Sequence, residues 1–253
     1  MKVETGMMLG ILYTLVMVPL VTYLLYKGKL RKELEWVILL LSALMGFAYF
    51  APMFPWQMQL LLLGKIPQAN LLMVIVATSA IVLSSLILGR VFCGHVCPIG
   101  AVQELTYIAP LKKVKVPSHW TDLVRWAMFI VILISSIVLS MNLTKLLGLQ
   151  DLFTLTLSFS AIIFLAIMVS STVVYRPFCR LFCPIGALSS LFSGRSLLGV
   201  RRQEGCVECG RCQKVCPSQV LKVRAGAECY LCGRCMETCQ KDSLKYSKGK
   251  VSK

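Results

Sequence analysis

Five long apolar stretches indicate that this 253-residue chain folds in a membrane. About 20 helical residues cross a bilayer core of about 30 Å, and each stretch is close to that length. They run Met7 to Tyr26, Glu35 to Phe54, Asn70 to Gly89, Leu123 to Met141 and Thr154 to Tyr175. A hydrophobic fraction of 57% agrees, because a soluble fold of this size cannot bury so much apolar surface. The sequence predicts an all-α polytopic membrane protein with about five transmembrane helices.

The distribution of Lys and Arg predicts the orientation of these helices. The chain has 27 Lys and Arg and a net charge of +16. With five spans, only Lys2, Lys65 and Lys145 fall on one side of the membrane, and the cations of the loops and the tail gather on the other. Since cytoplasmic loops carry the excess of Lys and Arg, we expect the N-terminus outside and the C-terminus in the cytoplasm of a multi-pass plasma-membrane protein. The same bias explains the positive charge without nucleic-acid binding.

A twelve-residue segment occurs twice. Residues 90–101 read RVFCGHVCPIGA and residues 176–187 read RPFCRLFCPIGA, with eight of twelve positions identical. Each copy follows a predicted span and two spans separate them, so both emerge on the cytoplasmic side. The chain therefore contains a parallel two-span internal repeat, and such symmetry often places a site at the repeat interface.

Each copy carries a C-x3-C-P motif, and together the two supply four thiols: Cys93, Cys97, Cys179 and Cys183. An α-helical turn would put the two sulfurs of each pair on one face. Four thiolates can bind one iron–sulfur cluster or one tetrahedral metal ion. The alternatives are disulfides, which a reducing cytoplasm disfavours, and unpaired buried cysteines. We expect an additional iron–sulfur centre shared by both loops at the cytoplasmic membrane surface.

The tail carries two further cysteine runs, CVECGRCQKVCP and CYLCGRCMETCQ, with the C-x2-C-x2-C-x3-C spacing of bacterial ferredoxins. In that pattern three cysteines of a run ligate one cluster and the fourth ligates the other. The first cluster would then take Cys206, Cys209, Cys212 and Cys239, and the second Cys229, Cys232, Cys235 and Cys216. Two zinc sites are the alternative, although structural zinc more often uses separated C-x2-C pairs.

We therefore expect two domains. Residues 1–192 would form the transmembrane domain with the two C-x3-C-P loops, and residues 193–253 a small cytoplasmic α+β domain of the bacterial 2[4Fe-4S] ferredoxin type.

Two CPIGA loops after membrane spans, followed by a twin-run tail, resemble the NapH/NosR group of membrane-bound polyferredoxins over about residues 70–245. The resemblance implies quinol oxidation and electron delivery to a respiratory reductase, with a quinone or quinol and a redox protein as partners. Whether such a chain is itself an enzyme, as a quinol dehydrogenase subunit, stays open.

Other cofactors lack their sequence signals. The chain has two histidines, His95 and His119, both in one loop, so a bis-His haem within the spans has no ligands, and no C-x-x-C-H motif occurs. No G-x-G-x-x-G motif predicts an NAD or flavin site. His95, whose pKa range suits proton transfer, and Glu104 are weak candidates for a quinol site. For His95 an interfacial structural role is the alternative.

The sequence thus predicts a membrane-anchored iron–sulfur subunit that moves electrons between the quinone pool or a membrane partner and tail clusters, for a respiratory reductase. A membrane-bound iron–sulfur redox sensor or an assembly factor is the alternative function. In that case the clusters would report redox state without a steady electron current.

Overall fold

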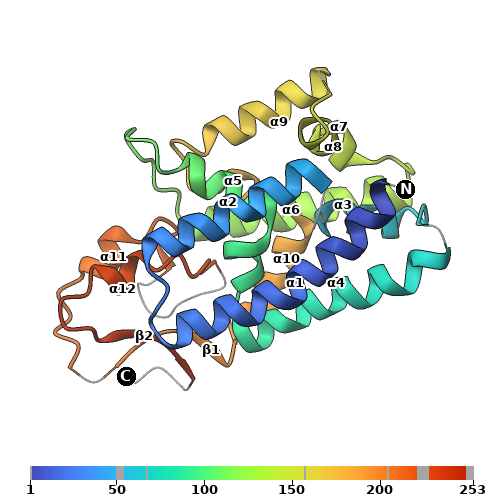
Figure 1. Cartoon of the computed structure of the whole chain (residues 1–253). Helices are drawn as coiled ribbons and strands as arrows, with labels where there is room; N and C mark the ends of the chain where they lie inside the picture. The colour runs from blue at the N-terminus through green and yellow to red at the C-terminus, as the bar shows by residue number, and fades with distance from the viewer. Residues whose placement is uncertain are drawn as a thin grey trace.

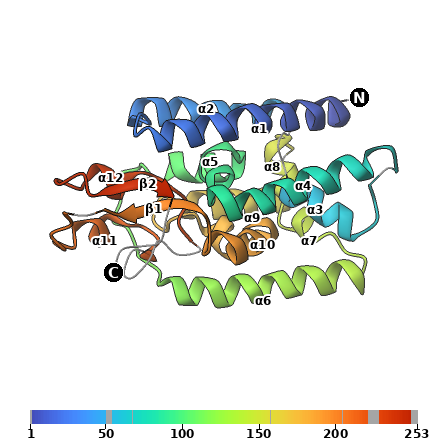
Figure 2. The same ribbon diagram turned by 90° about the horizontal axis from the view of Figure 1, so that it is seen from below.

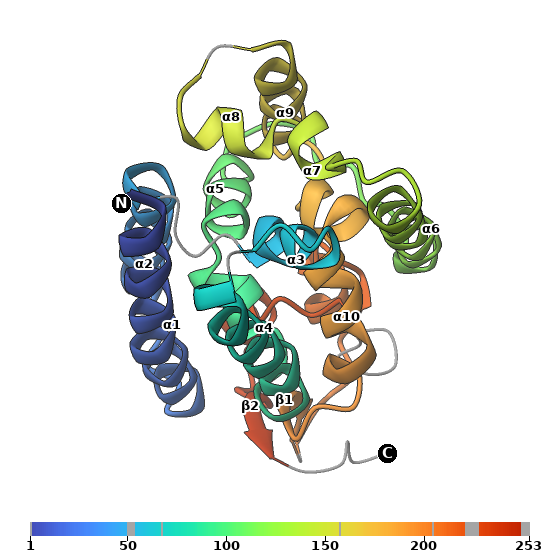
Figure 3. The same ribbon diagram turned by 90° about the vertical axis from the view of Figure 1, so that its right-hand side faces the viewer.

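A computed structural model gives the fold, and it describes residues 2–49, 54–66, 68–156, 158–203, 205–220 and 228–248. Five apolar helices lie along one direction and alternate in sense, so that one end of each faces the tail (Figures 1 and 2). They are α1 (Lys2–Tyr26), α2 (Lys32–Tyr49), α4 (Gln68–Leu88), α6 (Ser118–Ile137) and α9 (Phe159–Ser170). Figure 3 looks along this bundle, with α1 and α2 on one side, α6 on the other and α3 (Phe54–Leu62) between them.

Three of the described helices, α1, α4 and α6, are long and apolar enough to cross a membrane. At most 28% of each spanning window is buried within the protein, as expected for helices that face lipid. The α2–α3 pair, bent by 46°, provides a fourth span if it is counted as one. The second predicted stretch is therefore not one straight helix, and its residues 50–53 lie outside the described part.

The fifth predicted stretch is shorter as a helix than its sequence suggested. Helix α9 has 12 residues, because the Ser158 side chain caps its first turn and the helix ends at Ser170. A hydrogen bond from the Val174 amide to the Ser170 carbonyl forms the turn that follows. The total of five spans and the sidedness of the termini remain predictions.

Both C-x3-C-P loops fold back toward the bundle. Each consists of a five-residue π-helical turn and a short α-helix: η1 (Phe92–Val96) with α5 (Pro98–Thr106), and η2 (Phe178–Phe182) with α10 (Pro184–Ser193). Helix α5 contacts α9, and α10 contacts α4, so the short helix of each repeat packs on the span of the other. The two repeats are therefore interlocked.

The first loop reaches well into the bundle. The Ser42 hydroxyl, ten residues into α2 and so about 15 Å from its start, donates a 2.8 Å hydrogen bond to the His95 carbonyl. Further along α2, a Cβ on Gly46 would lie 2.5 Å from the Pro98 Cβ, so glycine permits this close approach. The first loop therefore packs beside the middle of α2, and its depth in the membrane remains a prediction.

The tail lies at the end of the bundle opposite the short helices α7 (Leu143–Leu146) and α8 (Leu149–Phe153) (Figure 1). It has two short helices, α11 (Arg211–Val215) and α12 (Arg234–Glu237), and two strands, β1 (Leu198–Arg202) and β2 (Leu244–Lys248). The strands pair antiparallel, with Leu198 opposite Lys248. The predicted boundary after residue 192 falls within the last turn of α10 and remains a prediction.

Candidate iron–sulfur sites

Three cavities are each lined by four cysteines. The outer tail cavity, of about 380 Å³, is lined by Cys206, Cys209, Cys212 and Cys239. Cys206 and Cys209 are exposed, and the other two are half-buried. These four cysteines are the set that the sequence predicts for the first tail cluster.

The inner tail cavity is lined by Cys216, Cys229, Cys232 and Cys235, the set predicted for the second cluster. Cys216 and Cys235 are buried, and Cys229 and Cys232 are half-buried. Burial raises the pKa of the Cys229 thiol to about 12 and that of the Cys232 thiol to about 11. These thiols need a positively charged metal centre to be thiolates at neutral pH.

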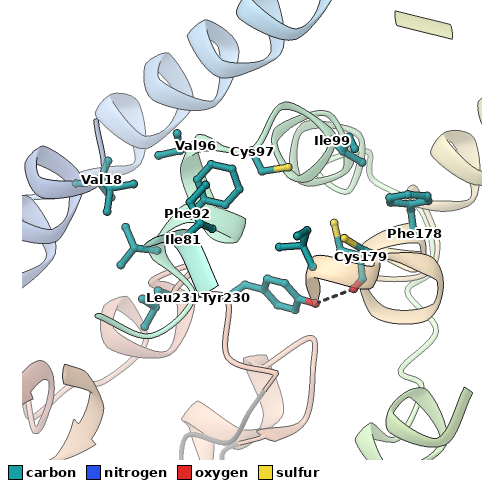
Figure 4. Packing of buried hydrophobic residues seen from close by; sticks show 14 of the residues in the cluster. Val18, Ile81, Phe92, Val96, Cys97, Ile99, Phe178, Cys179, Tyr230 and Leu231 are labelled. Atoms are coloured by element: carbon teal, nitrogen blue, oxygen red, sulfur yellow. Dashed lines mark hydrogen bonds between the residues drawn. The ribbon is translucent and has the colours of Figure 1, made fainter. Parts of the chain in front are cut away.

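The membrane cavity is lined by Cys93, Cys97, Cys179 and Cys183 together with Pro55 and Tyr230. Figure 4 shows the Cys97 and Cys179 sulfurs on the facing sides of the two loops, with Tyr230 next to them. The structure thus brings together the four repeat cysteines that the sequence predicts to share a centre.

Local structure explains how the second cysteine of each pair is held. Cys97 and Cys183 end the π-helical turns and are the N-caps of α5 and α10, whose first residues are Pro98 and Pro184. Proline suits this first helical position because its missing N–H would have no intrahelical partner there. A π-helical turn, and not the α-helical turn considered above, spans each pair. The prolines instead open the next helix.

These two helix N-termini make the membrane cavity suitable for negative charge. A helix N-terminus carries a partial positive charge and free N–H donors. The Gly186 amide donates a 3.4 Å hydrogen bond to the Cys183 sulfur. Both N-caps line the same cavity, so the fields of two helices add there.

Two buried arginines add full positive charges beside the membrane cavity. Arg90 and Arg176 occupy equivalent positions in the repeat, and each is 1% exposed. Arg176 pairs with Glu104 at 2.8 Å. Arg90 donates to the Gly186 carbonyl at 2.8 Å and to the Tyr230 hydroxyl at 2.9 Å, so these partners are neutral.

Among the described residues, no carboxylate hydrogen bonds or forms an ion pair with Arg90. The Glu228 carboxylate acts on Arg90 without a hydrogen bond or ion pair, so the buried guanidinium has no carboxylate in direct contact, and such burial is costly. A cluster bound by four thiolates is an anion, so the buried Arg90 fits the presence of such a cluster.

A single metal ion fits the outer tail cavity less well. In the part of the chain that the structure describes, no three His, Cys, Asp or Glu side chains are arranged to hold one ion. The four outer tail cysteines surround a space of about 380 Å³, whereas the inner tail and membrane cavities measure about 20 Å³ and 10 Å³. The outer space is larger than one zinc ion with Zn–S bonds of about 2.3 Å would fill, and four thiolates are the donor set of a [4Fe-4S] cluster.

Tyr230 lines both the inner tail cavity and the membrane cavity. It follows Cys229 directly, and its hydroxyl donates a 3.4 Å hydrogen bond to the Cys179 carbonyl. The Arg90 and Arg176 guanidiniums lie 5.1 Å and 4.9 Å from the centre of its ring. The residue therefore forms a shared wall between a tail site and the repeat site.

The two candidate quinol residues lie at or near a further cavity, the interface cavity, of about 310 Å³ between α2, α5 and α12. Glu104 lines it together with Glu35, Trp36, Ile108 and Cys232. Burial opposes ionisation of Glu104, but Arg176 and Arg234 outweigh it and lower its pKa below the usual value.

His95 does not line the interface cavity. It is fully buried, and its Nε2 lies 3.5 Å from the Glu35 carboxylate. His95 is therefore linked to the cavity through Glu35.

The residues that hold the tail on the bundle were not predicted from the sequence. The buried carboxylate of Glu228 accepts hydrogen bonds from Arg125 at 2.8 Å, Arg180 at 2.9 Å and Thr121 at 2.9 Å. One signal was available: Arg125 is a charged residue inside an apolar stretch, and such residues are seldom without a partner.

Comparisons with known proteins agree with this geometry. The family described as "4Fe-4S binding domain" matches residues 70–117 and 157–203. Each matched segment contains one C-x3-C-P pair, and both end before the tail cysteine runs.

Three relatives illustrate the similarity. An uncharacterized protein of Methanocaldococcus jannaschii is 36% identical over 55% of this chain and 63% of its own length. YccM of Escherichia coli, named for electron transport, is 27% identical over 63% of this chain and 50% of its own length. NirI of Paracoccus denitrificans is 28% identical over 54% of this chain and 23% of its own length.

The chain thus aligns with less than two thirds of each of these relatives. No solved structure matches it significantly. The two copies of the matched domain and these relatives confirm the resemblance, and the chain is a membrane polyferredoxin-like protein.

Proposed function

We propose that this iron–sulfur electron-transfer protein moves electrons between a quinone dissolved in the membrane and [4Fe-4S] clusters in the tail, for a respiratory reductase. One observation carries the proposal. The outer tail, inner tail and membrane cavities each have four cysteines, and the last two share Tyr230 as a wall. When bound, the clusters would supply one-electron carriers from the exposed end of the tail to the interior of the bundle.

Each cavity would hold one cluster. Cys206, Cys209, Cys212 and Cys239 would bind the first, and Cys216, Cys229, Cys232 and Cys235 the second. For the third, each matched 4Fe-4S segment contains only two cysteines, so a four-thiolate cluster needs both segments. Cys93, Cys97, Cys179 and Cys183 would provide it.

The interface cavity supports the quinone part of the proposal. It is next to the predicted cluster ligand Cys232, and Trp36 and Ile108 in its wall are 49% and 42% exposed on the surface that would meet lipid. Among the described hydrogen bonds, the Arg234 Nη1 atom is buried and has no acceptor. A quinone carbonyl could accept from it while the ring packs on the apolar wall.

Proton transfer also has a candidate in this cavity. Oxidation of one quinol releases two electrons and two protons, so it needs proton acceptors beside the ring. Glu104 is held ionised by two arginines and is a poor acceptor. Glu35, which lines the cavity and contacts His95, is the better candidate.

A cavity-filling variant tests this part. Ile108→Trp should block the interface cavity, whereas Leu111→Trp adds the same bulk at an exposed position that does not line it. A photoactivatable quinone should label wild-type protein and the Leu111 variant in nanodiscs, and label Ile108→Trp at least about tenfold less.

Quinol-linked reduction of the tail clusters, measured by stopped-flow absorbance, should be slower in Ile108→Trp than in Leu111→Trp. Equal labelling and equal reduction in both variants would place quinone elsewhere. Ligand-dependent spectral change without turnover in wild-type protein would instead favour the sensor function.

A further inference from the structure

The outer tail cavity has a surface that the electron-transfer role alone does not explain. Its cysteines are the most exposed of the three sets, and its rim carries Arg202, Arg211 and Lys241. Among the described residues, Glu208 is the carboxylate that lines the same cavity, and it lies 3.9 Å from Arg202. The rim therefore has an excess of positive charge around the most accessible predicted cluster site.

An apolar side chain lies among these charges. Val207, between Cys206 and Glu208, lines the cavity and is 64% exposed. An exposed apolar centre with a charged rim is the usual composition of a protein-binding patch. Electron-transfer encounters use small interfaces of this kind, commonly below about 1,200 Å² in total.

The position of this patch favours a soluble partner over lipid headgroups. Helix α11, which carries Arg211 and Cys212, lies beyond the ends of the long helices in Figures 1 and 2, and its Lys214 carbonyl accepts a hydrogen bond from Lys115 in the loop before α6. The positive charge of loops close to a membrane is explained by topology. Topology accounts for the sign of the charge on the tail, but it does not account for the grouping of three cations around the most exposed cysteine cavity.

We propose that the surface formed by Arg202, Val207, Arg211 and Lys241 docks a soluble redox protein through an acidic patch on that partner. Opposite charges raise the rate of encounter and orient the partner's redox group toward the cavity. This proposal goes beyond the electron-transfer function, because it gives the surface and the charge of the partner.

The test uses full-length protein in nanodiscs and a flavodoxin as a defined acidic electron carrier. The variant Arg211→Glu/Lys241→Glu reverses two rim charges. The control Lys245→Glu/Lys248→Glu makes the same change in net charge on exposed residues of β2 that do not line the cavity. Iron content is measured for each protein, so that loss of a cluster is separated from loss of docking.

Flavodoxin should associate with the rim variant about tenfold to a hundredfold more slowly than with wild type at low salt, because steering accelerates encounter by such factors. The difference should vanish at high salt, where charges are screened, and the control should stay within about threefold of wild type. Carbodiimide should cross-link Lys241 to flavodoxin carboxylates.

Equal association of wild type and rim variant at low salt would overturn the proposal. A defect that persists at high salt would do the same, and so would loss of binding to anionic lipid vesicles instead of flavodoxin. Because binding is read apart from electron transfer, a protein that holds its clusters but fails this test overturns only the docking surface.

Discussion

The guanidinium of Arg90, just before the first C-x3-C-P pair, donates a 2.8 Å hydrogen bond to the carbonyl of Gly186, just after the second pair. The equivalent arginine does the reverse, since Arg176 donates to the carbonyls of Cys93 and Gly94 in the first loop. Each repeat thus supplies the charge that braces the cysteine loop of the other. The hydrogen bonds that hold each cysteine loop therefore depend on the arginine of the other repeat.

Replacing one of these arginines should change the membrane cavity without disturbing the tail. We expect Arg90→Gln to lower the reduction potential of the cluster bound there by about 60 mV or more, a tenfold shift in a one-electron equilibrium. The reason is that a nearby buried cation favours the reduced, more negative cluster. Redox titration followed by EPR measures the shift.

The matched control is Arg195→Gln, which removes an exposed arginine just after α10. It should leave the potential unchanged. If the Arg90 variant titrates like wild type with full iron content, no cluster is held beside Arg90.

Removing the buried carboxylate of Glu228 should release the tail from the bundle. Glu228→Ala leaves the buried Arg180 without its carboxylate partner and leaves Arg125 with Asp122 alone, and breaking a buried pair in this way costs about 3–5 kcal/mol. Hydrogen exchange should show faster opening of the segment around α12. Glu237→Ala, which breaks a surface ion pair with Lys32, should cost at most about 1 kcal/mol, and similar protection in both variants would contradict this role.

The cysteine sets were predictable because they depend on spacing alone. The C-x2-C-x2-C-x3-C runs and the repeated C-x3-C-P pairs predict the same three sets that line the three cavities. Apolar length likewise predicted α1, α4 and α6. These features are local in the chain, so a sequence pattern is enough to reveal them.

The remaining features depend on contacts between distant residues. The first loop can pack closely against α2 because the small Gly46 lies opposite Pro98, 52 positions away. The hydrophobic periodicity of the sequence does not reveal such a pair. In the sequence, nothing distinguishes Tyr230 from the other residues between the tail cysteines. Only the fold shows that it lies between two cavities. Helix α9 is short because the Ser158 side chain caps its start and the helix ends at Ser170, and an average of hydropathy over a window does not detect such ends.

The predicted orientation can be tested with reporters. A phosphatase, active only outside the cytoplasm, should be active when fused before Met1, and a green fluorescent protein, active only inside, should fluoresce when fused after Lys253. The reason is the strong Lys and Arg bias toward one side. If the phosphatase were active only after Lys253 and the fluorescent protein only before Met1, the orientation would be the reverse of the predicted one. If both ends lay on the same side of the membrane, the number of spans could not be odd.

The central claim is that three clusters are bound, one of them by both repeats. Iron and acid-labile sulfide counts on anaerobically purified wild type and Cys97→Ser test it most directly. We predict about twelve iron and twelve sulfide in wild type, and about eight of each in the variant, with the EPR signals of the two tail clusters retained. Eight iron in wild type with no loss on substitution, or zinc in place of iron, would contradict the account.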